Sequence, residues 1–178
     1  MKKSYWLIGL LFLFLVTGCG MSNTPSTKVE ELLKRYNNNA DVVKTELGDY
    51  LSSLDLDDDN QKDYEDIYLR QYSDMTYEII DEKINGDNAV VTVKVKVYDY
   101  YTAEKDINDY ISTHQNEFYD NNVYSAGKAL KYRIGELKKV NNRTEYTMDF
   151  TLTKVNNVWT VDTLTNEQLE KIHGTYAY

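Results

Sequence analysis

The sequence predicts an α+β fold, in which an antiparallel sheet of about four strands, built from two hairpins, is packed on one face by helices. Two observations predict it. Segments with apolar residues three and four positions apart alternate with segments in which apolar residues recur at every second position. Two turn sequences, Asn85-Gly86-Asp87-Asn88 and Asn156-Asn157, each lie between two segments of the second kind. Asn and Gly tolerate the positive φ angles of tight hairpin turns.

Three helices are predicted before the first hairpin. The first opens at Thr27-x-x-Glu30, a capping-box sequence. The second begins at about Asp41, and the third follows the acidic run at residues 55–59. Apolar residues at helical spacing give each helix one face for burial. They are Val29, Leu32, Leu33 and Tyr36, then Val43, Leu47, Tyr50, Leu51 and Leu54, then Tyr64, Ile67, Tyr68 and Tyr72.

The first hairpin joins residues 75–84 to residues 89–101, and the second of these strands has the clearest alternation in the chain. A face of valines opposite a face with lysines indicates a strand that packs on helices on one side and meets water on the other. The first face has Val91, Val93, Val95 and Val97, and the second has Thr92, Lys94, Lys96 and Tyr98.

A helical segment separates the two hairpins. Residues 102–118 carry apolar residues at helical spacing, and residues 125–139 predict another helix. Asp120-Asn121-Asn122 interrupts the two. Because His114 falls on the apolar side of the first helix, we interpret it as a core or boundary histidine.

The second hairpin pairs residues 143–155 with residues 158–164. A short last helix is then capped by Thr165-x-x-Gln168 and ended by Gly174, since glycine adopts the left-handed conformation of a helix C-terminus. The residues of this hairpin predicted to face inward are Tyr146, Met148, Phe150, Leu152, Trp159 and Val161.

The N-terminal segment has the layout of a secretory signal. Met1-Lys2-Lys3 is a basic start, residues 5–17 are almost entirely apolar, and Val16-Thr17-Gly18 leads to the only cysteine, Cys19. The end of this run resembles the lipobox of bacterial lipoproteins. The resemblance implies that a diacylglycerol, with acyl chains of the palmitate type, is attached to the Cys19 sulfur and that residues 1–18 are removed as a signal peptide. The alternative is a plain signal peptide, or an uncleaved helix, with an incidental cysteine.

Behind the signal, the sequence predicts a short tether at residues 19–26 and a single α+β domain at residues 27–178. Cleavage before Cys19 leaves 160 of the 178 residues, enough for one domain with its own core. It removes two lysines and no acid, so the formal net charge changes from −9 to −11. A domain this acidic is repelled by nucleic acid and by anionic head groups. We therefore expect no nucleic-acid binding, and membrane attachment through the lipid on Cys19.

The domain also resembles those of small bacterial lipoproteins with a nuclear-transport-factor-two-like or cystatin-like fold. The resemblance depends on the early helix at residues 27–36, on the valine strand that follows an Asn-Gly-Asp turn at residues 85–97, and on the closing hairpin at residues 154–161 with its Trp-x-Val sequence. The helical stretch at residues 102–139 departs from the simplest plan of that family. The related fold hosts isomerases, dehydratases, ligand binders and interaction domains, so the resemblance does not settle function.

Five aspartates between the second and third predicted helices fall at positions 1, 3, 5, 9 and 12 of an EF-hand-like calcium loop. Asn60 stands where a glycine would make the turn, and the last aspartate replaces the bidentate glutamate. The alternative is a solvated loop whose aspartates cap the third helix. We favour that alternative, assign no metal ligand or cofactor, and keep calcium as the weaker hypothesis. The aspartates are Asp55, Asp57, Asp59, Asp63 and Asp66.

Candidate catalytic residues are few. The two histidines, His114 and His173, are far apart in the sequence, and we find no nucleophile elbow, metal-binding histidine cluster or Gly-rich phosphate loop. In the resembled fold, acidic and tyrosine side chains of a cone-shaped pocket can transfer protons. Asp99 and Tyr101 at a strand end, or Asp149, are the residues that would line such a pocket. The alternative is an ordinary strand end, and we assign no catalytic or cofactor-binding residue.

Tyrosine occurs 17 times. Tyr98 and Tyr100 fall on the polar face of their strand, where exposed rings would form a platform for a carbohydrate or a peptide. The alternative, which we favour, is that helices or a neighbouring segment cover them.

We therefore expect a lipid-anchored protein on the extracytoplasmic face of a bacterial cell membrane. Its most direct role is that of a non-catalytic module that binds a protein or glycan partner of the cell envelope. A small-ligand binder or an enzyme with a cone-shaped pocket is the alternative.

Overall fold

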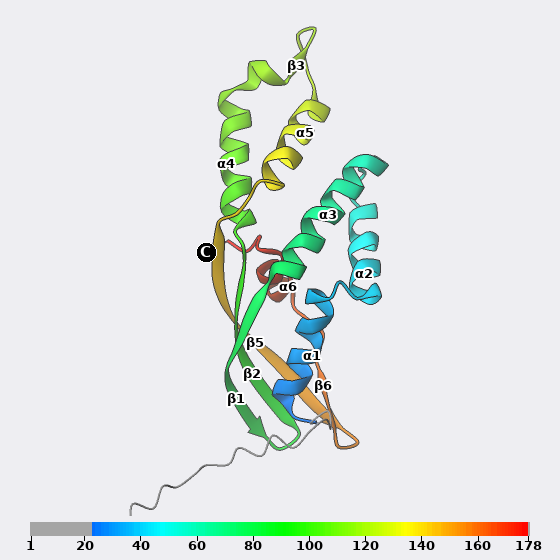
Figure 1. Ribbon diagram of the computed structural model, residues 1–178, viewed down its shortest axis with the longest axis vertical. Coiled ribbons are helices and arrows are strands. Elements are labelled where there is room, and N and C mark those ends of the chain that lie inside the picture. The colour runs from blue at the N-terminus through cyan, green and yellow to red at the C-terminus, as the bar shows by residue number, and fades with distance from the viewer. Residues whose placement is uncertain (1–22, 178) are drawn as a thin grey trace, which may run out of the picture.

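The computed structural model describes residues 23–177, which form an elongated molecule (Figure 1). A twisted sheet occupies one end, and α4 and α5 extend from the other end of its long strands (Figure 1). The helices are α1 (Pro25–Asn37), α2 (Asp41–Ser52), α3 (Asp58–Asp74), α4 (Tyr100–Thr113), α5 (Ala126–Leu137) and α6 (Asn166–His173), with a 3-10 turn η1 (Gln115–Phe118). The strands are β1 (Thr76–Asn85), β2 (Asn88–Tyr98), β3 (Tyr119–Asp120), β4 (Val123–Tyr124), β5 (Arg143–Val155) and β6 (Val158–Val161).

The predicted α+β class is confirmed. The main sheet has four antiparallel strands in the order β1-β2-β5-β6, so the two predicted hairpins join through β2 and β5. Val91 of β2 faces Phe150 of β5 in this central pairing. Asn156 and Asn157 both have positive φ angles in the turn between β5 and β6, as does Gly86 between β1 and β2.

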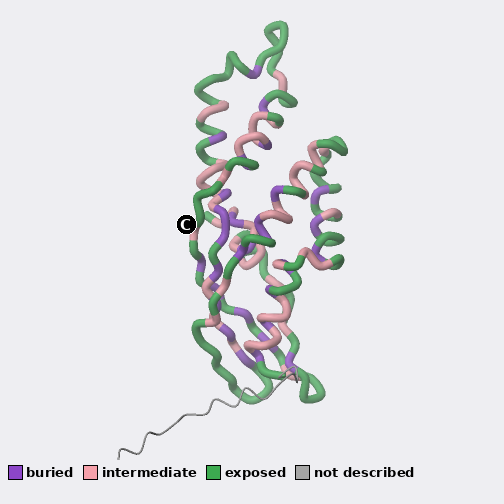
Figure 2. The backbone as a smooth tube through the Cα atoms, viewed as in Figure 1, coloured by how far each residue is buried: buried purple, intermediate pink, exposed green. Residues whose placement is uncertain are grey.

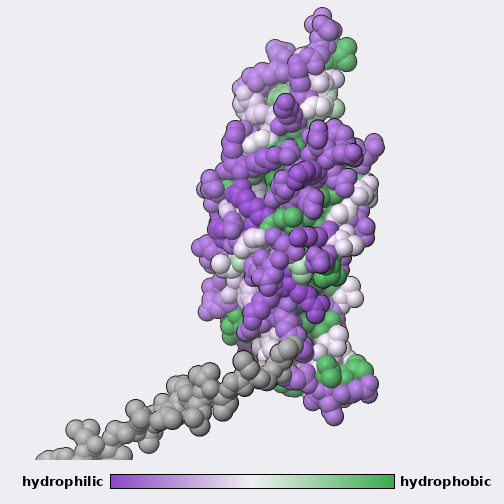
Figure 3. Space-filling model, turned by 45° about the vertical axis from the view of Figure 1, so that its right-hand side comes forward, coloured by the Kyte–Doolittle hydropathy of each residue, from purple (hydrophilic) through white to green (hydrophobic). Residues whose placement is uncertain are grey.

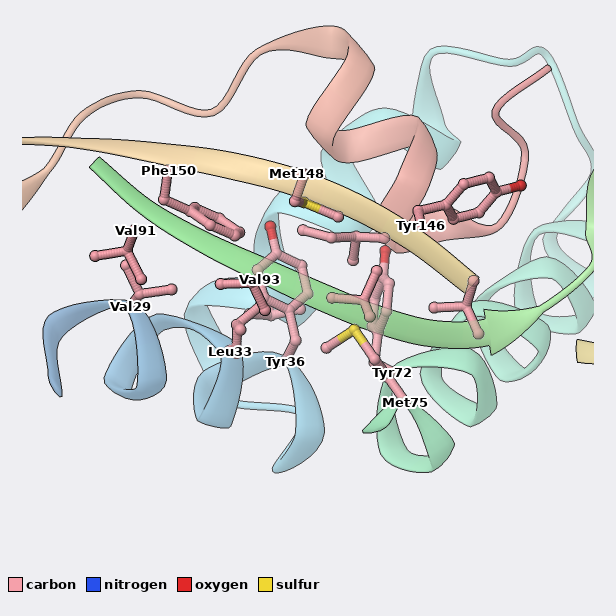
Figure 4. Close-up of a cluster of buried hydrophobic side chains, with 14 of the residues drawn as sticks. Val29, Leu33, Tyr36, Tyr72, Met75, Val91, Val93, Tyr146, Met148 and Phe150 are labelled. Atoms are coloured by element: carbon pink, nitrogen blue, oxygen red, sulfur yellow. The ribbon is translucent and has the colours of Figure 1, made fainter. Parts of the chain in front are cut away.

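One face of the sheet is the core and the other meets water. The four valines on the inner face of β2, at positions 91, 93, 95 and 97, are each 0% exposed, as predicted, and α1, α3 and α6 lie against this strand. Figure 4 shows residues of this core, with Val29 and Leu33 of α1 and Tyr72 of α3 pointing toward β2 and β5. Buried and exposed residues accordingly alternate along the long strands (Figure 2). On the open face, Lys96 forms an ion pair with Glu145 of β5.

A β-bulge changes the face that β1 presents. The register with β2 shifts between Ile79 and Asp81, so that Glu82 pairs with Val91 and lies on the helix side of the sheet. The Glu82 carboxylate accepts a hydrogen bond from the Ser26 backbone N–H, 2.8 Å away, in the first turn of α1. A negative charge at this place is favourable because it meets the unsatisfied N–H groups and the positive end of the helix dipole.

The segment between the hairpins forms an arm that projects beyond the sheet (Figure 1). It contains α4, the short β3–β4 hairpin and α5, and a second core cluster lies where α4 and α5 meet α3. Two boundaries differ from the prediction. The strand predicted to reach residue 101 ends at Tyr98, because the side chain of Asp99 accepts from the Thr102 backbone N–H and starts α4. The helix predicted to reach residue 118 ends at Thr113 and is followed by η1.

The observed start of α1 differs from the prediction, whereas both ends of α6 agree with it. The first helix begins at Pro25, inside the predicted tether, because Thr24 rather than Thr27 is its N-cap, and proline fits the first turn. The predicted capping box of Thr165 and Gln168 is present on α6, and Gly174 ends that helix with φ +74°.

The predicted signal peptide at residues 1–18 and the lipidated Cys19 lie outside the described residues. Within residues 23–177, no helix has both the length and the apolar character needed to cross a bilayer.

Candidate functional site

A groove lined by four tyrosines lies between α1, α2, α3 and α6. Its volume is about 500 Å³, which is in the range of small-molecule sites. We call it the tyrosine groove. Its lining residues are Tyr36, Val43, Glu46, Leu47, Tyr50, Tyr68, Tyr72, Asn166, Leu169, Glu170, His173 and Thr175.

The helices form the groove because each packs only part of its apolar stripe on a neighbour. Helix α2 buries Val43, Leu47 and Leu51, whereas Tyr50 on the same helix is 48% exposed. Gln71 of α3, which is 0% exposed, holds the back of the groove together. Its side-chain amide donates to the His173 carbonyl at 2.8 Å, and its Oε1 accepts from the Tyr98 backbone N–H at 2.8 Å. The end of α6 is thereby fixed to α3 and β2.

The aromatic rings of the groove contact one another. Tyr36 and Tyr72 meet edge to face, with ring centroids 5.2 Å apart and planes at 78°. Tyr68 stacks on Tyr72 at 6.3 Å. The His173 ring lies 5.2 Å from the Tyr68 ring and 5.8 Å from the Tyr72 ring. Tyr36 and Tyr72 are 5% and 2% exposed, so they form the base, and Tyr50 stands at the rim.

Three phenol groups at the base and wall are free to bind a ligand. Among residues 23–177, the hydroxyls of Tyr36, Tyr68 and Tyr72 have no hydrogen-bond partner, and none of the three oxygens is a fully buried atom. Burial raises the pKa of Tyr36 to about 12 and also raises the pKa values of Tyr68 and Tyr72. All three therefore remain neutral hydroxyls near neutral pH and can both donate and accept.

The charges of the groove are negative. Glu46 and Glu170 are its acidic lining residues, and both are exposed. Burial lowers the pKa of His173 to about 4, so its imidazole is neutral at neutral pH. The Glu46 carboxylate contributes to the raised pKa values of both Tyr36 and Tyr72, although burial is the larger cause. The Glu46 carboxylate therefore interacts electrostatically with the two tyrosines at the base of the groove.

A second cavity of about 540 Å³ lies beside the tyrosine groove, between α1 and the segment that runs from β6 to α6. The two share Tyr36, Glu46 and Leu169. The second cavity has charges of both signs, because Lys28 and Arg35 line it together with Glu31, Glu46 and Asp162.

The residues predicted for a catalytic pocket are not brought together. The Asp99 carboxylate is the N-cap of α4 and lines a separate groove between α4 and α5, and Tyr101 does not line that groove. The backbone N–H of Tyr101 donates to the Gly174 carbonyl at 2.8 Å. Asp149 lies on the exposed side of β5, where the Thr92 hydroxyl donates to it at 2.6 Å.

The tyrosine platform is absent because both rings are buried, as the favoured alternative predicted. Tyr98 and Tyr100 are 8% and 2% exposed. The Tyr98 hydroxyl donates to Asp74 at 2.6 Å, and the guanidinium of Arg70 lies 4.2 Å from its ring centroid. Capping by Asp99 turns the chain into α4 at this point, so the strand alternation that predicted the platform does not continue.

The acidic segment does not adopt the loop of an EF-hand. Asp57 is the N-cap of α3, and its carboxylate accepts from the Asn60 backbone N–H at 2.8 Å. Helix α3 thus contains the positions of Asp59, Asp63 and Asp66, of which Asp63 pairs with Lys138. In the part of the chain that the structure describes, no group of three or more His, Cys, Asp or Glu side chains is placed to hold a metal ion.

The histidine prediction is wrong for His114. This residue is exposed after the end of α4, with its ring stacked on Tyr110 at 4.0 Å. The residue that occupies a protected position is His173. Sequence reasoning missed the groove, although Tyr68 and Tyr72, four positions apart on one helical stripe, were a visible signal for an aromatic wall.

Comparison with protein-family models and with curated proteins gives no match. Among solved structures, the chain is similar to the crystal structure, at 2.62 Å resolution, of ycdA from Bacillus subtilis subsp. subtilis str. 168, which is described as a candidate lipoprotein. The identity is 20% and the TM-score 0.47, and the match covers 82% of this chain and 46% of the other. This chain therefore spans less than half of its neighbour's length. Similarity at this level does not transfer a family or a function.

Proposed function

We propose that this protein is a lipid-anchored, non-catalytic binding protein of the bacterial cell envelope that uses the tyrosine groove to hold a small molecule. The observation that carries the ligand-binding part is the set of three neutral, unpartnered phenol groups around a cavity of about 500 Å³. Accessible phenol hydroxyls with no partner in the protein can both donate to and accept from a bound molecule, and such polar groups in an otherwise apolar cavity are typical of small-molecule sites.

The anchoring part of the proposal is supported by the N-terminal sequence. The basic start, the apolar run and the lone Cys19 agree with a lipoprotein signal. The first described residue, Asn23, bonds to the Asn157 carbonyl and accepts from the Trp159 backbone N–H. An anchor a few residues upstream would therefore hold the β5–β6 turn near the membrane, with the arm of α4 and α5 at the far end (Figure 1).

The binding mode differs from the protein or glycan partner expected from the sequence alone. The surface seen in Figure 3 is mainly hydrophilic, with hydrophobic side chains in small separate patches. Exposed apolar residues include Val123 in the β3–β4 hairpin and Val155 and Val158 beside the β5–β6 turn. The tyrosine groove, in contrast, combines a cavity with aromatic walls and acidic residues. Assignment to the nuclear-transport-factor-two-like or cystatin-like class remains part of this proposal.

Two experiments test the two parts. For the anchor, the full chain and its Cys19→Ala variant are expressed in a bacterial host and fractionated. We expect the parent chain in the membrane fraction with a lipidated N-terminal cysteine, and the variant unprocessed by the lipoprotein pathway. Equal membrane attachment without lipid in both would refute the anchor.

For the groove, the full chain is exposed to a panel of small cationic, neutral and anionic compounds while ¹³C signals of the tyrosine rings are recorded. We expect at least one class to shift the signals of Tyr36, Tyr50, Tyr68 and Tyr72 and to leave those of Tyr119 and Tyr124 in the β3–β4 hairpin unchanged. If no compound of the panel shifts a groove signal at a concentration of about 10 mM, which exceeds the dissociation constant of any specific ligand, ligand binding in this groove is refuted.

A further inference from the structure

We propose that the tyrosine groove selects a small organic cation, an ammonium or alkylammonium compound. This inference rests on the proposed function, because it names the class of ligand for the same groove. It is carried by three features of the groove: the charge of its lining, the nature of its walls, and the contrast with the cavity beside it.

The lining is negative without a compensating cation. Glu46 and Glu170 are carboxylates, His173 is neutral, and no lysine or arginine is among the lining residues that the structure describes. A bound anion would meet two carboxylates, whereas a cation would meet opposite charge in a partly desolvated site. Electrostatic complementarity of this kind gives specificity.

The lack of basic residues in the lining of the tyrosine groove does not follow simply from the acidic composition of the whole chain. The neighbouring cavity shares Glu46 with the groove and adds Glu31 and Asp162, but there Lys28 and Arg35 offset part of the negative charge. The absence of basic residues is thus a property of the tyrosine groove and not of every cavity on this side of the molecule. The contrast favours a cation in the groove.

The walls are those that bind ammonium groups. A cation is attracted to the electron-rich face of an aromatic ring within about 6 Å of its centroid, and recognition of quaternary ammonium by several rings uses this attraction. Tyr36 and Tyr72 meet edge to face and close the base, so the rings that a cation can reach are those of Tyr68 in the wall and Tyr50 at the rim. Their open hydroxyl oxygens can accept from the N–H groups of an amine.

The test uses matched pairs of probes that differ in charge and little in shape. Choline is compared with 3,3-dimethyl-1-butanol, in which carbon replaces the cationic nitrogen, and cadaverine is compared with 1,5-pentanediol. Binding to the full chain in a non-ionic detergent is measured by isothermal titration calorimetry. We expect at least one cation to bind at least tenfold more tightly than its neutral counterpart, with an affinity that falls as salt is added.

Variants locate the effect. The double variant Glu46→Gln/Glu170→Gln removes the two carboxylates, and Tyr50→Leu removes the exposed ring at the rim. Each should weaken binding of the cation at least fivefold. Asp109→Asn, which removes an exposed charge on α4 outside the groove, should change it less than twofold. Thermal unfolding of each variant verifies that the fold is retained.

The outcomes separate this inference from the proposed function. If a neutral probe binds as tightly as its cation, or if only anionic or neutral members of the wider panel bind, the groove holds a ligand but cation selection is refuted. If neither cation binds at about 10 mM, cation selection is likewise refuted. If the whole panel leaves the groove unaffected, the proposed function fails with it.

Discussion

Gln71 of α3 and Gly174 at the end of α6 lie in direct contact behind the tyrosine groove. The Gln71 side chain donates to the Tyr98 carbonyl at 3.2 Å, and Gly174 lies so close to the same carbonyl that a Cβ atom there would overlap it and the Gln71 amide. The pair joins α3, α6 and β2 at one point, and so fixes the distance between two walls of the groove.

Replacement of Gly174 by alanine should be costly. Gly174 has φ +74° and no space for a Cβ atom. We expect Gly174→Ala to lower the free energy of unfolding by about 3 kcal/mol, from backbone strain and steric overlap. Gly86→Ala is the matched control, since Gly86 has φ +60° but nothing within 4 Å of the added Cβ. Its loss should be about 1 kcal/mol. If urea denaturation gives the same loss of unfolding free energy for both variants, the close contact at Gly174 does not contribute to stability.

Gln71→Leu keeps the approximate volume of the side chain but removes its hydrogen bonds. The buried N–H of Tyr98 then loses its partner, and the carbonyls of Tyr98 and His173 each lose a donor. We expect a loss of about 2–4 kcal/mol in unfolding free energy, because unsatisfied buried groups retain their desolvation cost. Gln61→Leu, which removes only the bond to the Ser52 hydroxyl, should cost less than about 1 kcal/mol. A loss from Gln71→Leu no larger than that of its control would contradict this role.

Burial of His173 should make stability fall in acid. Its pKa is lowered from 6.5 to about 4, so between these values the unfolded chain binds a proton that the folded chain does not. The folded state therefore carries no penalty from this group above pH 6.5, and its free energy of unfolding falls by about 3 kcal/mol in all as the pH is lowered through 6.5 to below 4.

The His173→Phe variant keeps a ring between Tyr68 and Tyr72 and cannot be protonated. We expect its unfolding free energy to change less between pH 7 and pH 5 than that of the parent chain. Parallel pH curves for the parent and His173→Phe would contradict burial of this histidine.

The bulge in β1 should contribute to stability through the contact of Glu82 with the start of α1. Glu82 accepts from the N–H and hydroxyl of Ser26 only because the register shift turns it toward the helices. We expect Glu82→Gln to destabilise the protein by about 0.5–1 kcal/mol. Asp81→Asn, which affects an exposed pair with Lys83, should cost less than half as much. Thermal unfolding with both variants in the same buffer gives the comparison, and a reversed order would contradict the capping role.

Much of the fold follows from local patterns. The valines of β2, the asparagine turns and the capping box at Thr165 each favour one structure through their own backbone and side-chain preferences. The structure differs where a single side chain overrides such a pattern. Asp99 ends β2 by capping α4, and Thr24 starts α1 before the predicted residue. The bulge after Ile79 is a further case, because alternation alone gives no sign of it.

The groove was harder to predict because it is made by residues far apart in the chain. Tyr36, Tyr68 and His173 come from three helices whose mutual distance depends on the tertiary contact of Gln71 with α6. The sequence predicted tyrosines on helical stripes, where burial against the sheet is the usual outcome. It contained no information on which ring would lie over the core and which would remain at a cavity wall.

Native mass spectrometry of the full chain, extracted from bacterial membranes in a non-ionic detergent without chelator, tests the central claim most directly. We expect the mass of a lipidated chain that begins at Cys19, with an additional small organic molecule that is lost in the Glu46→Gln/Glu170→Gln variant. The bare mass of an unlipidated polypeptide, the same for the parent and the variant, would contradict both the anchor and the ligand-binding groove.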